Sequence, residues 1–116
     1  MKKAWDIIYV NDIEKSVEFY EKVLGLKVKD RLNMGSEMQI AFMELNNEIC
    51  IELIYSGKKE VSKESVVLVF TTDNLDNTIQ DLKGKNIDPG EIISPNPNTQ
   101  FIHVEDPDGV IIQIQE

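Results

Sequence analysis

The stretch that decides the fold is residues 9–26, YVNDIEKSVEFYEKVLGL. It begins at the end of a short apolar strand, because residues 7–10 are IIYV. Asp12 then stands at a helix N-cap, where its carboxylate can accept hydrogen bonds from the first free amides. Apolar residues recur at helical spacing from Ile13 to Leu24, and Gly25 follows at the position of a left-handed C-cap. The stretch therefore predicts a strand, a helix and the start of a second strand.

Further strands follow this helix. Met38–Leu45 and Glu48–Tyr55 alternate apolar and polar residues, and Asn46-Asn47 between them favours a tight turn. The second half of the chain repeats the order. It predicts a helix over Leu75–Gly84 and strands over Val66–Phe70, Gly90–Ile93, Gln100–Val104 and Val110–Gln115.

The two halves can be aligned residue by residue. Residues 10–14, VNDIE, lie over residues 72–76, TDNLD, at an offset of 62. This offset pairs Trp5 with Val67 and, with one gap, Glu52 with Gln113. A repeat of this length is typical of a duplicated supersecondary unit. We therefore expect one α+β domain over 1–116, built from two βαβββ modules at about 1–57 and 64–116.

Charge and composition narrow the function classes. Twelve basic residues against 21 acidic ones give a net charge of −9, which disfavours nucleic acids and anionic membrane surfaces as partners. The acidity either attracts a cationic ligand or simply keeps the protein in solution. The longest apolar run, Val66–Phe70, is too short for a membrane span. With no signal-peptide run and a single cysteine, Cys50, a cytoplasmic location is expected.

Three segments carry a family resemblance: residues 9–26, residues 70–76 (FTTDNLD) and residues 106–112 (DPDGVII). They resemble the vicinal oxygen chelate superfamily, the group of glyoxalases, bleomycin-resistance proteins and extradiol dioxygenases. The resemblance implies that the two modules form a curved mixed sheet around a shared pocket. It also implies a homodimer that binds a small molecule.

The resemblance points to four metal-ligand positions, one on the first and one on the last strand of each module. Trp5 and Val67 stand where histidine is usual, and Gln113 stands where glutamate is usual. Glu52 alone matches. Because a stable divalent site needs three or four protein donors, we expect neither a metal nor another cofactor.

Strand alternation predicts which side chains face the pocket. The expected ligand-binding residues are aromatic or polar, and no catalytic residue is assigned: Trp5, Tyr9, Glu52, Phe101, His103 and Gln113. Two interpretations of Glu52 stay open. It is a ligand anchor or general base, or it is an inherited ligand position now paired with Gln113 or His103. His103 is a strand residue bonded to a neighbour, or a base or replacement ligand.

These observations lead to two main hypotheses for the function. The first is a metal-independent small-molecule-binding protein that resembles the bleomycin-resistance branch and sequesters a cationic or aromatic ligand without chemistry. The alternative is a metal-dependent lyase, isomerase or dioxygenase that resembles the glyoxalases. A third, weaker hypothesis is an interaction module that has lost ligand binding. The missing metal donors favour the non-enzymatic function.

Overall fold

A computed structural model of the chain describes residues 4–35, 37–57 and 66–116. These residues fall into two compact units, divided between residues 62 and 63. The units correspond to the two predicted modules, and each has the predicted βαβββ order. The prediction that they form one domain around a shared pocket concerns both units together and stays a prediction.

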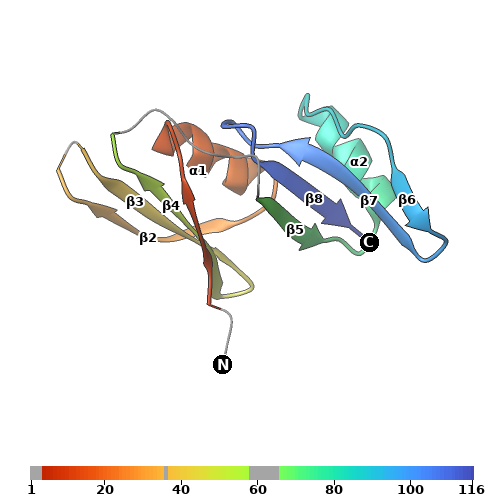
Figure 1. Cartoon of the computed structure of the whole chain (residues 1–116), viewed down its shortest axis with the longest axis horizontal. Coiled ribbons are helices and arrows are strands. Elements are labelled where there is room, and N and C mark those ends of the chain that lie inside the picture. Colours follow the sequence, from red (N-terminus) through yellow and green to blue (C-terminus); the bar gives the residue numbers. More distant parts are fainter. Residues whose placement is uncertain (1–3, 36, 58–65) are drawn as a thin grey trace. The chain divides into compact units, whose positions relative to one another are not determined.

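Unit one contains a mixed four-stranded sheet and one helix (Figure 1). The strand order is β1-β4-β3-β2; β1 runs parallel to β4, and the other neighbours are antiparallel. Helix α1 packs against β2, β3 and β4. The elements are β1 (Asp6–Tyr9), α1 (Ile13–Lys22), β2 (Lys27–Asn33), β3 (Gln39–Leu45) and β4 (Glu48–Tyr55).

The local signals of the sequence act as predicted in this unit. The Asp12 side chain accepts a hydrogen bond from the Lys15 amide at 3.1 Å and caps α1. Asn46 and Asn47 both have positive φ, as a two-residue hairpin turn requires. The helix was expected to reach Leu24, but it ends at Lys22, and Val23 is its C-cap.

Unit two repeats the architecture, with strand order β5-β8-β7-β6 and a parallel β5–β8 pair. The predicted strand at Gly90–Ile93 is wrong, because β6 only begins at Ile93. Pro89 has no N–H to donate to a neighbouring strand, and Gly90 has a positive φ of +63° instead of an extended backbone. The strand therefore starts only after these two residues. The elements are β5 (Val67–Thr71), α2 (Leu75–Gly84), β6 (Ile93–Asn96), β7 (Thr99–Glu105) and β8 (Ile111–Gln115).

The sheet register confirms the internal repeat. Glu52 pairs with Ile7 in unit one, and Gln113 pairs with Val69 in unit two. Ile7 and Val69, on the first strands of the two units, are 62 residues apart in the sequence. Glu52 and Gln113, on the last strands, are 61 residues apart, as the alignment with one gap requires. The structure therefore places Glu52 and Gln113 at equivalent positions of their sheets.

One face of each sheet is buried and carries the core. Ala41, Met43, Ile51 and Leu53 are buried in unit one, and Ile102, Val104, Ile112 and Ile114 are buried in unit two. The alternating residues of the same strands lie on the opposite face, here called the open face. In the described part of the chain, no helix has the length and apolar character needed to cross a membrane.

Candidate functional site

Unit one gathers an aromatic pair and a carboxylate on its open face. The Trp5 indole Nε1–H donates a hydrogen bond to Glu52 Oε1 at 2.9 Å. The Trp5 ring stands edge-on to Phe42, with ring centroids 6.1 Å apart. Phe42 is the antiparallel pair of Glu52, so β3 and β4 fix the two side chains next to each other. We call Trp5, Phe42 and Glu52 cluster one.

The partner of Glu52 differs from the expected one. In one of the two open interpretations, Glu52 was paired with Gln113 or His103, but the indole of Trp5 fills this role. The reason is the parallel register of β1 and β4: Ile7 is the partner of Glu52, so Trp5, two residues earlier, points to the same face. Because Trp5 remains 40% exposed, the cluster is open to a ligand.

Unit two carries a second group at the equivalent place. His103 Nε2 and Gln113 Oε1 are 2.9 Å apart, and His103 pairs with Gln113 across β7 and β8. The Phe101 ring stacks on His103 with centroids 5.3 Å apart. His103 is thus a strand residue bonded to a neighbour, and its role as a base or a replacement ligand stays a prediction. We call Phe101, His103, Gln113 and Gln115 cluster two.

The amide of Gln113 determines the tautomer of His103. Gln113 Nε2 donates to Gln115 Oε1 at 3.0 Å, which turns Gln113 Oε1 toward the imidazole. That oxygen can only accept, so in this arrangement His103 Nε2 carries the proton. With this tautomer, the Nδ1 of His103 is available to accept a hydrogen bond from a ligand.

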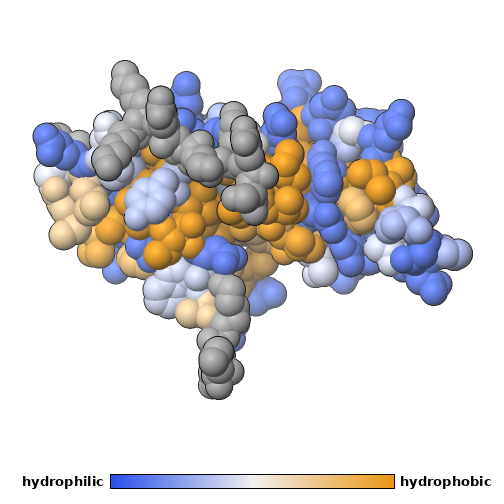
Figure 2. Space-filling model, viewed as in Figure 1, coloured by the Kyte–Doolittle hydropathy of each residue, from blue (hydrophilic) through white to orange (hydrophobic). Residues whose placement is uncertain are grey.

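Apolar side chains extend both clusters along the first strands. Ile7 and Tyr9 follow Trp5 on β1, and Val67 and Val69 lie on β5; all four are at least half exposed. Figure 2 shows hydrophobic residues on the visible face over these strands. Tyr9 was predicted to bind ligand, and its 53% exposure leaves it accessible. All six predicted ligand-binding residues lie in the described chain, and the clusters join five of them into two groups.

Phe42 was missed in the sequence. The repeat contains the signal that could have found it: an offset of 61 places Phe42 over His103, just as it places Glu52 over Gln113. Each sheet thus carries an aromatic or imidazole ring beside its last-strand polar residue.

Cys50 lies on β4 and is half-buried. Loss of solvation raises the pKa of its thiol above the usual 9.0, and the nearby Asp6 carboxylate adds to the rise. The thiolate is therefore disfavoured, and Cys50 is a poor nucleophile.

The four metal-ligand positions implied by the sequence do not fit a divalent ion. The Trp5 indole has an N–H group and no lone pair for a metal, and this N–H donates its hydrogen bond to Glu52. Val67 offers nothing, and the Gln113 oxygen faces His103. Within residues 4–35, 37–57 and 66–116, no three His, Cys, Asp or Glu side chains are grouped to hold a metal. Two oxygen donors are fewer than such a site requires.

Comparison with known proteins now establishes the family. A model of the Glyoxalase/Bleomycin resistance protein/Dioxygenase superfamily matches residues 4–114. The chain belongs to this superfamily. The uncharacterized protein YwbC of Bacillus subtilis is 34% identical over 115 residues, spanning 91% of this chain and 90% of YwbC. Lactoylglutathione lyase of Escherichia coli O157:H7 is 27% identical over 125 residues, spanning 100% of this chain and 93% of the lyase.

Solved structures share the fold of this chain. SMU.1112c superposes with a TM-score of 0.78 at 19% identity, covering 100% of this chain and 99% of that one. The trypanothione-dependent glyoxalase I of Leishmania major gives 0.76 at 18% identity, covering 98% and 86%. At such identities the likeness is one of fold, and function has to be argued from the site.

Proposed function

We propose that this superfamily member is a metal-independent binding protein for a cationic or aromatic small molecule. The observation that carries the proposal is the hydrogen bond from Trp5 to Glu52. At the one position with a matching metal ligand, the carboxylate is held by an indole in place of a neighbouring histidine. The site keeps a negative charge and gains an aromatic surface.

Cluster one has the chemistry to recognise a cation. A carboxylate beside an exposed indole attracts positive charge through both its own charge and the electron-rich ring face. Cation–π contacts contribute roughly 0.5–2 kcal/mol, more as the site is desolvated. The net charge of −9 adds a long-range attraction for cationic molecules.

Cluster two has the groups to bind a planar molecule that donates a hydrogen bond. The free Nδ1 of His103 accepts a hydrogen bond, and the stacked Phe101 and His103 rings offer a flat surface to a planar group. Apolar surface with a few fixed polar groups is typical of small-molecule sites.

Trp5 is the chain's single tryptophan, so its fluorescence reports directly on cluster one. Protein treated with EDTA should be titrated with a panel of cationic aromatic dyes, their neutral analogues and anionic aromatics. We expect saturable changes with cations. Glu52→Gln, which retains an oxygen for Trp5 but loses the charge, should weaken binding about tenfold, equal to about 1.4 kcal/mol.

The control for this titration is Glu48→Gln, because Glu48 is an exposed residue of the same strand. Its affinity should equal that of the wild type. Equal binding by the Glu52→Gln variant, or no saturable binding by any cation of the panel, would rule out the proposal.

A metal-dependent lyase, isomerase or dioxygenase is the second candidate. It is favoured by Glu52 at a matching ligand position and by the 27% identity to lactoylglutathione lyase. The assay is formation of S-lactoylglutathione from methylglyoxal and glutathione by protein incubated with nickel, zinc, manganese or iron. Turnover that depends on an added metal and is lost in Glu52→Gln would make this the primary function. Absence of turnover with all four metals would exclude the lyase activity as the function of this protein.

A further inference from the structure

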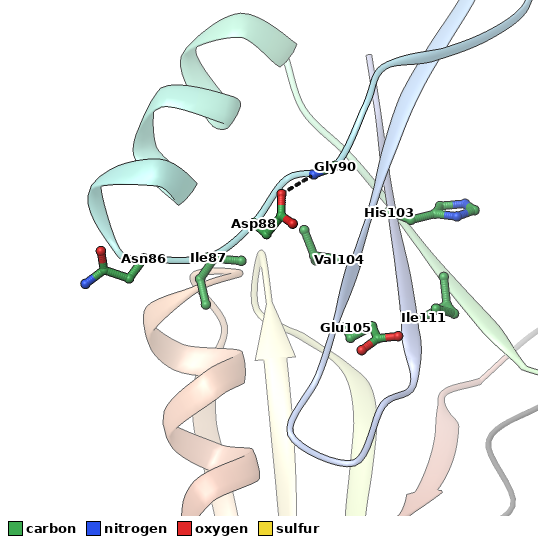
Figure 3. A pocket seen from close by; sticks show the side chains of 8 residues that line it. All are labelled: Asn86, Ile87, Asp88, Gly90, His103, Val104, Glu105 and Ile111. Carbon is green, nitrogen blue, oxygen red and sulfur yellow. Dashed lines mark hydrogen bonds between the residues drawn. The ribbon is translucent and has the colours of Figure 1, made fainter.

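A hollow of about 390 Å³ lies in unit two, at the edge of β7 (Figure 3). His103 of cluster two also lines the hollow, but its ring points away from Asp88 and Gly90 in Figure 3. Asp88 Oδ1 accepts a hydrogen bond from the Gly90 amide at 2.9 Å. The lining residues that matter here are Ile87, Asp88, Gly90, Val104, Glu105 and Ile111.

The internal repeat shows what occupies the same place in unit one. After each helix the chain turns through a residue with positive φ, Gly25 in unit one and Asn86 in unit two. The next amide then bonds back into the helix: Leu26 N to Tyr20 O, and Ile87 N to Leu82 O. The offset from here on is 61, which places Gly90 over Lys29 and Glu105 over Glu44.

In unit one this region is covered by the first half of β2. Lys27 pairs with Glu44 and Val28 with Met43. Lys29 Nζ lies 3.9 Å from Glu44 Oε2, so a lysine side chain accompanies this glutamate. The hollow that remains there, beside Lys27 and Glu44, is only about 220 Å³.

Unit two lacks this cover. Its pairing between β6 and β7 extends only to Ile93 and Phe101, the equivalents of Leu32 and Ile40. Pro89 replaces Val28 and cannot donate to a ladder. Gly90 replaces Lys29, so the side chain that accompanies Glu44 in unit one has no counterpart.

We propose that this hollow binds a primary alkylammonium group in the place that corresponds to the Lys29 side chain. Glu105 supplies the counter-charge, and in the described part of the chain no ion pair involves it. Asp88 adds a second carboxylate, and no lysine or arginine lines the hollow. Ile87 and Ile111, which are half-buried, offer apolar surface to the alkyl stem, just as a lysine stem packs on apolar neighbours.

The ammonium could come from a free amine or from a lysine of another protein, and the chemistry is the same. Two probes distinguish the sources: n-butylamine, which has the length of a lysine side chain, and Nα-acetyl-lysine methylamide, which carries its backbone. Tighter binding of the first indicates a free amine, and tighter binding of the second indicates a lysine residue. Both results support the site.

The experiment is a ¹⁵N–¹H NMR titration of the full chain at fixed pH and ionic strength. We expect saturable shifts of the amides around 87–90 and 104–111 with either amine, and none with n-butanol. Glu105→Gln should weaken binding about threefold or more, in line with the modest strength of partly exposed ion pairs. Glu91→Gln, an exposed neighbour outside the lining, should leave the affinity unchanged.

Gly90→Lys is the complementary test. It introduces a lysine at the position equivalent to Lys29 of unit one, and this side chain should fill the hollow and abolish amine binding. The positive φ of Gly90 disfavours a side chain, so the Glu105→Gln result stands if this variant does not fold. Linear, non-saturable shifts, or equal affinity of Glu105→Gln, would overturn the proposal. These readouts lie in unit two and do not depend on Trp5 fluorescence, so this proposal and the proposed function fail separately.

Discussion

Ser16 is fully buried on α1, and among the described residues its hydroxyl oxygen has no hydrogen-bond partner. A buried hydroxyl without a partner carries a desolvation cost of about 1–3 kcal/mol. Ser16→Ala removes that cost and leaves only a small space. We expect the free energy of unfolding, measured by urea denaturation, to stay equal or rise by about 1 kcal/mol. A loss of similar size would show that the hydroxyl is bonded in solution.

Cys50 should react slowly. Burial raises the pKa of its thiol, so at pH 7 the reactive thiolate is scarcer than in a free cysteine. We expect its rate with a chromogenic disulfide to be at least about tenfold below that of N-acetyl-cysteine at the same pH. The rate should increase as the pH rises above 9. A rate at pH 7 equal to that of the free amino acid would contradict this account.

At the scale of single residues, the sequence predicted the sheet face on which a side chain lies better than it predicted the hydrogen-bond partner of that side chain. Period-two alternation placed Phe101 and His103 on one face, and the structure has them opposite the buried Ile102 and Val104. Alternation carries no information on the offset between strands, however, and hydrogen bonds depend on that offset. The Trp5–Glu52 bond depends on the parallel register of β1 with β4, which only the folded sheet determines.

At the scale of elements, Arg31 links β2 to α1. Its two terminal nitrogens lie 2.6 and 3.1 Å from the Glu14 carboxylate oxygens. The hydrogen bond from Arg31 lowers the pKa of Glu14 below its ordinary 4.5, against a smaller effect of burial. The link therefore stabilises the fold fully above the ordinary pKa, and this contribution is lost as the pH falls through the lowered value.

We therefore expect Glu14→Gln to lower the free energy of unfolding at pH 7 by about 0.2–1 kcal/mol, the range of exposed ion pairs. At pH 2, where the carboxyl is protonated in both folded and unfolded chains, the variant and the wild type should be equally stable. Urea denaturation at the two pH values measures the difference. Glu48→Gln is the control, and an equal loss at both pH values would contradict the assigned link.

Long elements with strong caps were predicted well, and the short edge strand was not. The range of α2, Leu75–Gly84, is the predicted one, because Asn74 caps it and its apolar spacing is regular. β6 was misplaced because Ser94-Pro95-Asn96-Pro97 is typical of a turn. A proline is nevertheless tolerated at the edge of a sheet, and β6 is an edge strand.

At the scale of the whole molecule, β1 and β5 are each at the edge of their sheet. Ile7 and Val69 on these strands are 54% and 57% exposed. Exposed apolar edge strands invite pairing with another chain, and we expect a homodimer. Sedimentation at micromolar concentration should give twice the mass of one chain. Val69→Asp should shift the protein toward monomer, whereas Asn77→Asp on α2 should not. A monomeric wild type would contradict this prediction.

The central claim is that the protein binds its ligand without a metal ion, and a measurement of bound metal tests this claim most directly. Untagged protein should be purified without chelator, incubated with divalent ions, desalted and analysed by mass spectrometry beside Glu52→Gln. We predict far less than one metal ion per chain in both proteins, because Trp5 and Val67 offer no lone pair to a metal and Gln113 offers only a neutral oxygen beside the Glu52 carboxylate in the set of donors. About one ion per wild-type chain, lost in Glu52→Gln, would contradict the account.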